Sequence, residues 1–191
     1  MTTQPTRRTR RKFTQKQIAV LFVVAGLVLA AFYVVDRVVL NPWSMSTGGR
    51  PALSGYWQGT ADFTPGGRRN VVVEFRYEFG TGTSRSHSYD PLAGTMKTCG
   101  SDGTREAHLF GDSENRSGSL FEVSTSYEGT GPGDYIFDLR GEWEGDRVGM
   151  RARYSVQLPE GQYLPSDKTT GSLAFELRRT TKATFEATCP T

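Results

Sequence analysis

The residues with the greatest chemical potential lie in one short stretch, SHSYD at positions 86–90. It offers hydroxyl groups, the imidazole of His87 and the carboxylate of Asp90, which are the groups of a Ser-His-Asp triad. The members of a triad, however, are brought together by the fold, and the base is oriented by a third group. Five neighbours in one polar loop do not meet that requirement, so we assign no catalysis to this stretch.

The histidines and cysteines of the chain do not form a metal-site pattern. Cys99, Cys189, His87 and His108 are too widely separated for the closely spaced ligand pairs of zinc sites. His108 lies between two apolar residues in an alternating run and is predicted to face solvent. No pair of inward carboxylates is evident for acid–base catalysis. The sequence therefore predicts a protein that is not an enzyme and needs no cofactor or metal.

An apolar stretch, IAVLFVVAGLVLAAFYVV at 18–35, organises the rest of the chain, and it contains no charged residue and no proline. Eighteen residues at ~1.5 Å each form a helix of about 27 Å, close to the thickness of a bilayer core. The first seventeen residues contain no acidic residue and six basic ones: Arg7, Arg8, Arg10, Arg11, Lys12 and Lys16. Positive charge stays on the cytoplasmic side of a membrane. We therefore expect the N-terminus in the cytoplasm, the apolar stretch in the cell (inner) membrane, and the residues beyond 40 in the periplasm or outside the cell.

Two other interpretations of the N-terminus are a twin-arginine export signal, from TRRKF at 9–13, and a cleaved secretory signal. A cleaved signal has an apolar core of roughly 7–15 residues followed by polar sequence. Here Ala30 and Ala31 are followed by apolar residues through position 35, which favours an uncleaved anchor. Together with Ala25 and Gly26, these small residues permit close contact with another membrane helix.

The chain therefore divides into a basic cytoplasmic tail (1–17), a transmembrane helix (18–40), a linker (41–52) and an external domain (53–191). Tyr33 and Trp43 fall near the outer boundary of the membrane, where their rings favour the headgroup layer. Beyond the tail, 17 basic residues face 20 acidic ones, a net charge of −3. The external domain thus has no basic excess to attract nucleic acid, and we expect the tail to lie near anionic membrane lipids.

The external domain shows a period of two, which is typical of half-buried strands. The clearest alternating runs cover residues 73–79, 121–127, 135–143, 148–156 and 173–177, and weaker ones cover 92–99 and 104–110. Glycine-containing turns separate these runs, as at 65–67, 101–103 and 145–146. About eight antiparallel strands with short connections and one apolar face predict an all-β fold, an up-and-down barrel, with a β-sandwich as the alternative.

The turn Gly145-Asp146 joins two of these strands in a two-residue hairpin. Its register predicts Trp143 opposite Val148, Leu139 opposite Ala152, and Phe137 opposite Tyr154. On the solvent-exposed face it predicts Asp138 opposite Arg153. It also places Arg140 opposite Arg151, two like charges, so either Arg140 or Arg151 is expected to pair with Glu142 instead.

Cys99 and Cys189 are the two cysteines of the chain, and both lie in the external domain. In an oxidising compartment an even number of cysteines favours a disulfide. A bond between these two residues would close a loop of about 90 residues and hold the C-terminal tail against the middle of the domain.

The sequence LSGYWQG at 53–59 resembles the opening strand of lipocalin-like (calycin) barrels, which carry a Gly-x-Trp there. GDY at 133–135 is similar to a second lipocalin motif, and the pattern of the first repeats in LRGEWEG at 139–145. The resemblance spans residues 53–189 and implies that Trp57 closes one end of a barrel. A disulfide from a middle strand to the C-terminal tail is also common in that group.

The barrel interior holds both large rings and small residues. An eight-stranded barrel is just wide enough to be filled by side chains or to hold one small ligand, and this composition fits either outcome, with filling favoured. The rings that would pack the core or face a ligand are Trp57, Phe75, Tyr77, Phe137, Trp143 and Tyr154.

Three classes of function follow from these features. The first is a non-enzymatic accessory or structural subunit, whose helix packs against a larger membrane protein complex and whose barrel lies on the outer face of that complex. The second is a membrane-tethered, lipocalin-like binder of a lipid, pigment or other apolar small molecule. The third, an enzyme, has no supporting motif. The first is favoured because it requires no site chemistry.

Overall fold

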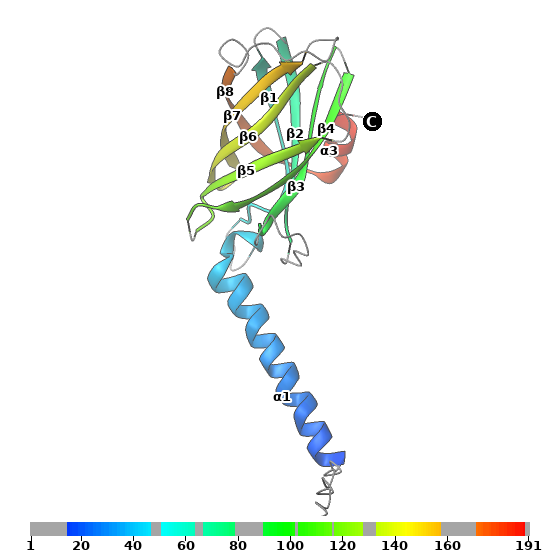
Figure 1. Cartoon of the computed structure of the whole chain (residues 1–191), viewed down its shortest axis with the longest axis vertical. Coiled ribbons are helices and arrows are strands. Elements are labelled where there is room, and N and C mark those ends of the chain that lie inside the picture. The colour runs from blue at the N-terminus through cyan, green and yellow to red at the C-terminus, as the bar shows by residue number, and fades with distance from the viewer. Residues whose placement is uncertain are drawn as a thin grey trace, which may run out of the picture.

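The computed structural model describes residues 15–46, 51–63, 67–78, 90–101, 103–115, 117–127, 133–157 and 171–189. A long N-terminal helix leads into one end of a β-barrel, and a short C-terminal helix lies against the side of that barrel (Figure 1).

The long helix has two parts. Helix α1 (Gln15–Val34) continues without a break into the π-helical turn η1 (Val35–Leu40), and a 3₁₀ turn, η2 (Pro42–Ser44), follows. The 26 residues from Gln15 to Leu40 are long and apolar enough to cross a membrane, a test that a signal sequence would also pass. Valine, leucine and phenylalanine side chains are exposed on all sides of the helix, so no polar face is available to solvent.

Eight antiparallel strands form the barrel. They are β1 (Gly55–Phe63), β2 (Gly67–Tyr77), β3 (Leu92–Gly100), β4 (Gly103–Ser113), β5 (Leu120–Tyr127), β6 (Gly133–Glu144), β7 (Arg147–Gln157) and β8 (Gly171–Thr180). Each strand pairs with its neighbour in sequence, and β1 closes the barrel by pairing with β8. The predicted up-and-down barrel is confirmed, and the β-sandwich alternative is excluded because the sheet has no open edge.

The β6–β7 hairpin has the predicted register over most of its length. Trp143 pairs with Val148, Leu139 with Ala152, Asp138 with Arg153, and Arg140 with Arg151. Gly145 in the turn adopts φ +63°, a conformation that glycine reaches at low cost.

A β-bulge between Ile136 and Asp138 changes the register beyond that point, so the predicted pairing of Phe137 with Tyr154 is wrong. Ile136 pairs with Tyr154 instead and is almost completely buried, whereas Phe137 is only half-buried. A bulge adds one residue to one strand and so reverses which residues face inward. The predicted inward ring at position 137 is therefore replaced by Ile136.

One large apolar cluster of buried residues forms the core, and it includes Trp43, Leu53, Trp57, Phe75, Phe121 and Tyr154. A second, small cluster lies outside the sheet, where Phe185 of α3 (Lys182–Thr188) packs beside Val72 and Tyr56. The rings of Tyr56 and Phe185 are 5.4 Å apart. Burial, together with the nearby Glu74 carboxylate, raises the pKa of the Tyr56 phenol.

The disulfide between Cys99 and Cys189 is confirmed, with 5.6 Å between the two Cα atoms. It links β3 to the residue that follows α3. The C-terminal helix is thus held to the barrel both by a covalent bond and by apolar contact.

Candidate functional site: the junction of helix and barrel

The end of the barrel next to η1, here called the proximal end, is closed by two tryptophans. Trp57 of β1 is fully buried, and its indole Nε1 donates a hydrogen bond of 2.9 Å to the carbonyl oxygen of Leu53. The guanidinium of Arg179, from the end of β8, lies 4.3 Å from the centre of the Trp57 ring. Arg179 also donates to the carbonyl oxygens of Ala52 and Ser54. Partial burial in this arrangement lowers the pKa of the guanidinium.

The second tryptophan, Trp43, comes from the segment between helix and barrel. It is 1% exposed and belongs to the main core, so the prediction that its ring lies in the headgroup layer is wrong. Its carbonyl oxygen accepts a hydrogen bond of 2.9 Å from the backbone N–H of Leu53, and its ring lies 5.8 Å from that of Tyr77. Because burying an indole removes a large apolar area from water, this position outcompetes the membrane interface.

Gly118, in the connection between β4 and β5, makes room for Trp43. It adopts φ +70°, and a Cβ atom there would lie only 2.4 Å from atoms of the Trp43 side chain. A residue with a side chain would therefore be strained by the backbone conformation and would also collide with the indole. The β4–β5 connection is thus shaped to receive the tryptophan.

Asp36, on the last turn of the helix, makes the polar contact to the barrel. Its carboxylate accepts a hydrogen bond of 2.5 Å from the hydroxyl of Tyr77, at the end of β2. The side-chain amide of Asn41 donates to the carboxylate and the backbone carbonyl of Asp36, both at 3.3 Å. The backbone N–H of Asn41 donates to the same carbonyl at 2.9 Å. A hydrogen bond with one charged partner is stronger than a neutral one, so Asp36 fixes the helix end to β2.

Arg37 covers this contact from the outside. Its guanidinium lies 3.7 Å from the centre of the Tyr77 ring and 5.7 Å from that of Tyr33, and 3.9 Å separates it from the Asp36 carboxylate. Both charged side chains are largely shielded from solvent, at 22% and 12% exposure for Arg37 and Asp36. The guanidinium therefore compensates the buried carboxylate and binds the aromatic face at the same time.

Together these residues form what we call the junction: Asp36, Arg37, Asn41, Trp43 and Tyr77. In the sequence, Asp36 and Arg37 are two charged residues directly after the apolar stretch 18–35, and residues 41–52 are predicted to be a linker. The available signal was the NPW sequence at 41–43, in which a proline can begin a short helical turn. The buried contacts of Trp43 could not be read from that pattern.

The opposite, distal end of the barrel interior contains a buried charged side chain. Arg69 of β2 is 5% exposed, and its guanidinium lies 5.6 Å from the centre of the Phe63 ring, which meets the Tyr154 ring edge-on at 5.2 Å. Farther around the barrel, the hydroxyl of Tyr127 accepts a hydrogen bond of 2.9 Å from the backbone N–H of Ile136.

The predicted interior rings fall into three groups. Trp57, Phe75 and Tyr154 lie in the core, and Tyr77 and Trp143 pack against it while partly exposed. Phe137 does not belong to the core, as described above.

The other predicted residues are not brought together into a site. Ala25, Gly26, Ala30 and Ala31 are exposed on α1, and Lys16 lies in its first turn. The remaining five basic residues of the tail, and positions 86–89, lie outside the described residues. His108 is exposed on β4, as predicted. Within the described ranges, no three histidine, cysteine or acidic side chains are placed to hold a metal ion.

The fold and junction define a class of architecture, a closed eight-stranded up-and-down barrel carried on one apolar helix. No protein-family model and no curated protein matches the sequence. One solved structure that it resembles is titled "Structure of EF1p2_mFAP2b bound to DFHBI"; the sequence identity is 16% and the TM-score 0.43. The match covers 67% of this chain and 94% of the other.

Proposed function

We propose that this protein is a non-enzymatic, single-pass accessory subunit of a membrane protein complex. Its helix anchors it in the cell membrane with the basic tail in the cytoplasm, and its lipocalin-like barrel is held on the periplasmic face. The observation that carries the proposal is the junction, because it fixes the orientation of the barrel relative to the helix.

A ligand-binding domain that is merely tethered to a membrane needs no fixed orientation, so a flexible linker is sufficient for it. Here the connection instead inserts Trp43 into the barrel core and attaches Asp36 to Tyr77. Such ordering costs conformational entropy, which is offset by burial and hydrogen bonds. A fixed orientation is useful to a protein whose barrel must meet a partner surface at a set height and angle.

The helix supports the same proposal. It is exposed from Gln15 to Val35, and its surface is apolar on all sides apart from its two ends. At ~1.5 Å per residue its 26 residues extend about 39 Å, more than a bilayer core of ~30 Å. Gly26 and Ala30 lie one helical turn apart on one face, where a partner helix could approach closely.

The alternative function is a membrane-tethered binder of a lipid, pigment or other apolar molecule. The feature that favours it is the distal interior, where the buried guanidinium of Arg69 lies near the Phe63 ring and the Phe63 ring meets that of Tyr154. Such a lining suits an apolar molecule that carries an anionic group.

Co-purification from native membranes tests the two functions. The full-length protein, at natural abundance, is extracted in mild detergent, and co-purifying proteins and small molecules are identified by mass spectrometry. Gly26→Leu with Ala30→Leu should preserve insertion but reduce the recovery of partner proteins by about tenfold, because the helices can no longer approach closely.

Val24→Leu with Val28→Leu is the matched control, since it enlarges another face of the same helix and should leave recovery unchanged. Full recovery of partners by the Gly26/Ala30 variant would show that the helix is only an anchor. A wild-type protein that purifies alone with a bound apolar molecule would establish the tethered-binder function instead.

A further inference from the structure

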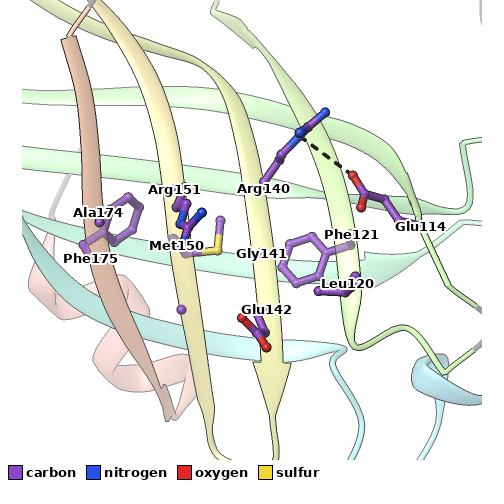
Figure 2. A pocket seen from close by; sticks show the side chains of 11 residues that line it. Glu114, Leu120, Phe121, Arg140, Gly141, Glu142, Met150, Arg151, Ala174 and Phe175 are labelled. Atoms are coloured by element: carbon purple, nitrogen blue, oxygen red, sulfur yellow. Dashed lines mark ion pairs between the residues drawn. The ribbon is translucent and has the colours of Figure 1, made fainter.

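The outer surface of the barrel carries a hollow of about 560 Å³ over strands β5 to β8 (Figure 2). Exposed residues that line it include Leu120, Arg140, Glu142 and Arg151, and the small residues Gly149 of β7 and Ala174 of β8 form part of its floor. A second hollow of about 390 Å³ shares Arg140 and Arg151 with the first. The two arginines therefore form a ridge between two depressions of one surface.

Arg140 is neutralised by acidic residues of its own chain. Its guanidinium lies 3.2 Å from the Glu122 carboxylate and 3.8 Å from that of Glu114, and Figure 2 shows it turned toward Glu114. The hydrogen bond and charge of Glu122 raise the pKa of this guanidinium. The prediction that Arg140 or Arg151 pairs with Glu142 is therefore wrong, because Glu114 and Glu122 approach from the other side.

Arg151 and Glu142, in contrast, are not neutralised by a neighbouring charge among the residues described. Both are exposed, and neither forms an ion pair or a side-chain hydrogen bond within the described part of the chain. They lie close together, because Glu142 is paired with Gly149, two residues before Arg151 on β7. The hollow thus presents one uncompensated positive charge and one uncompensated negative charge, on neighbouring strands and offset by two residues.

Leu120 adds an apolar contact beside these charges. It is 40% exposed, and it is the one large hydrophobic side chain of the barrel that is exposed in the described ranges. It pairs with Glu142 across β5 and β6, so it borders the same depression. Glycine at 149 and alanine at 174 leave the adjoining floor uncovered, with room for a side chain from another molecule.

We infer that this hollow binds a second copy of this chain, with Arg151 of each copy facing Glu142 of the other. In a two-fold interface the same patch of both copies is in contact. A patch with one free charge of each sign can therefore form two equivalent ion pairs with a second copy of itself. The two Leu120 side chains would then enter the uncovered floors at Gly149 and Ala174. A closed barrel has no free strand edge for pairing, so association must use outward side chains of this kind.

Anchoring in one membrane allows such a small patch to hold two copies together. Two copies anchored in one bilayer share the same orientation, and a two-fold axis along the membrane normal keeps both hollows at the same height. Confinement to the bilayer raises the effective concentration, so a patch smaller than a standard soluble interface suffices. This inference uses the anchor but does not depend on the accessory role.

Energy transfer between labelled full-length chains tests the inference. One population carries a donor and the other an acceptor at the C-terminus, and both are reconstituted in vesicles of phosphatidylcholine and phosphatidylglycerol over a series of lipid-to-protein ratios. The wild type should show transfer that persists on dilution with lipid. Arg151→Glu alone and Glu142→Arg alone should each weaken association by about tenfold or more, because both symmetry-related contacts become repulsive.

Mixing the Arg151→Glu chain with the Glu142→Arg chain is the decisive step. In the mixed pair the contacts between the substituted residues are attractive, so transfer should return while each variant alone remains dissociated. Arg147→Glu is the matched control, since it reverses an exposed charge on the same strand away from the hollow and should change nothing. Wild-type transfer no higher than random proximity, or equal loss of transfer in the mixture and in the single variants, would overturn the inference.

Discussion

Replacing Trp43 by alanine tests whether the segment between helix and barrel is part of the folded domain. The indole is 1% exposed, and truncating a buried tryptophan costs about 3–5 kcal/mol. Its Nε1 atom, however, has no hydrogen-bond partner among the described residues, and removing an unsatisfied buried donor returns about 1–3 kcal/mol. Taking the middle of each range, we therefore expect a net loss of about 2 kcal/mol in the free energy of unfolding.

The assay is urea unfolding of the full-length protein in detergent micelles, followed by near-ultraviolet circular dichroism of the barrel. With a slope of about 2 kcal/mol per molar urea, the midpoint should fall by about 1 M. Phe32→Ala is the control, because Phe32 is 70% exposed on the helix and makes no contact with the barrel core. Equal midpoints for Trp43→Ala and the wild type would refute the reasoning, since they are expected if Trp43 lies in the headgroup layer on a free linker.

Three further predictions concern the junction, the disulfide and the bulge. Tyr77→Phe removes a hydrogen bond to a carboxylate and should lower the free energy of unfolding by about 1.5–3 kcal/mol; spin labels on helix and barrel should also report a broader distance distribution, and an unchanged distribution would show that the hydrogen bond does not fix the orientation. Reducing the Cys99–Cys189 bond should destabilise the barrel by about 2–5 kcal/mol, as measured by unfolding with and without reductant; two free thiols in the untreated protein would contradict this. Ile136→Ala should cost about 2–5 kcal/mol and Phe137→Ala clearly less, whereas the reverse order would place Phe137 in the core.

The strand pattern was readable from sequence because its physical cause is local. In a strand, successive side chains point to opposite faces, so the alternation around Val73 and around Leu139 indicates both the strand and its buried face. The turn at Gly145 then set the register of one hairpin, from Trp143 to Asp138. The same local logic failed at Phe137, since a bulge inserts a residue without leaving a distinctive mark in the sequence.

The candidate site was less predictable than the fold. Interior rings such as Trp57 followed from the alternation and from the lipocalin-like motif. The junction did not, because Tyr77 and Asp36 are 41 residues apart and meet only when the helix docks on the finished barrel. Similarly, Arg151 and Glu142 have no ion-pair partner in the described part of the chain because Arg140 pairs with Glu114 and Glu122, which the fold brings close to it.

The sequence by itself determined the elements of this protein: one apolar helix with basic residues before it, about eight alternating strands, and one cysteine pair. These properties rest on composition and short-range periodicity, which a single chain displays directly. Only the tertiary structure decided that the sheet closes on itself, that Trp43 belongs to the core, and that Asp36 binds Tyr77. Each of these depends on side chains distant in sequence competing for the same buried space or the same charge, and that competition is settled only when the whole barrel is assembled.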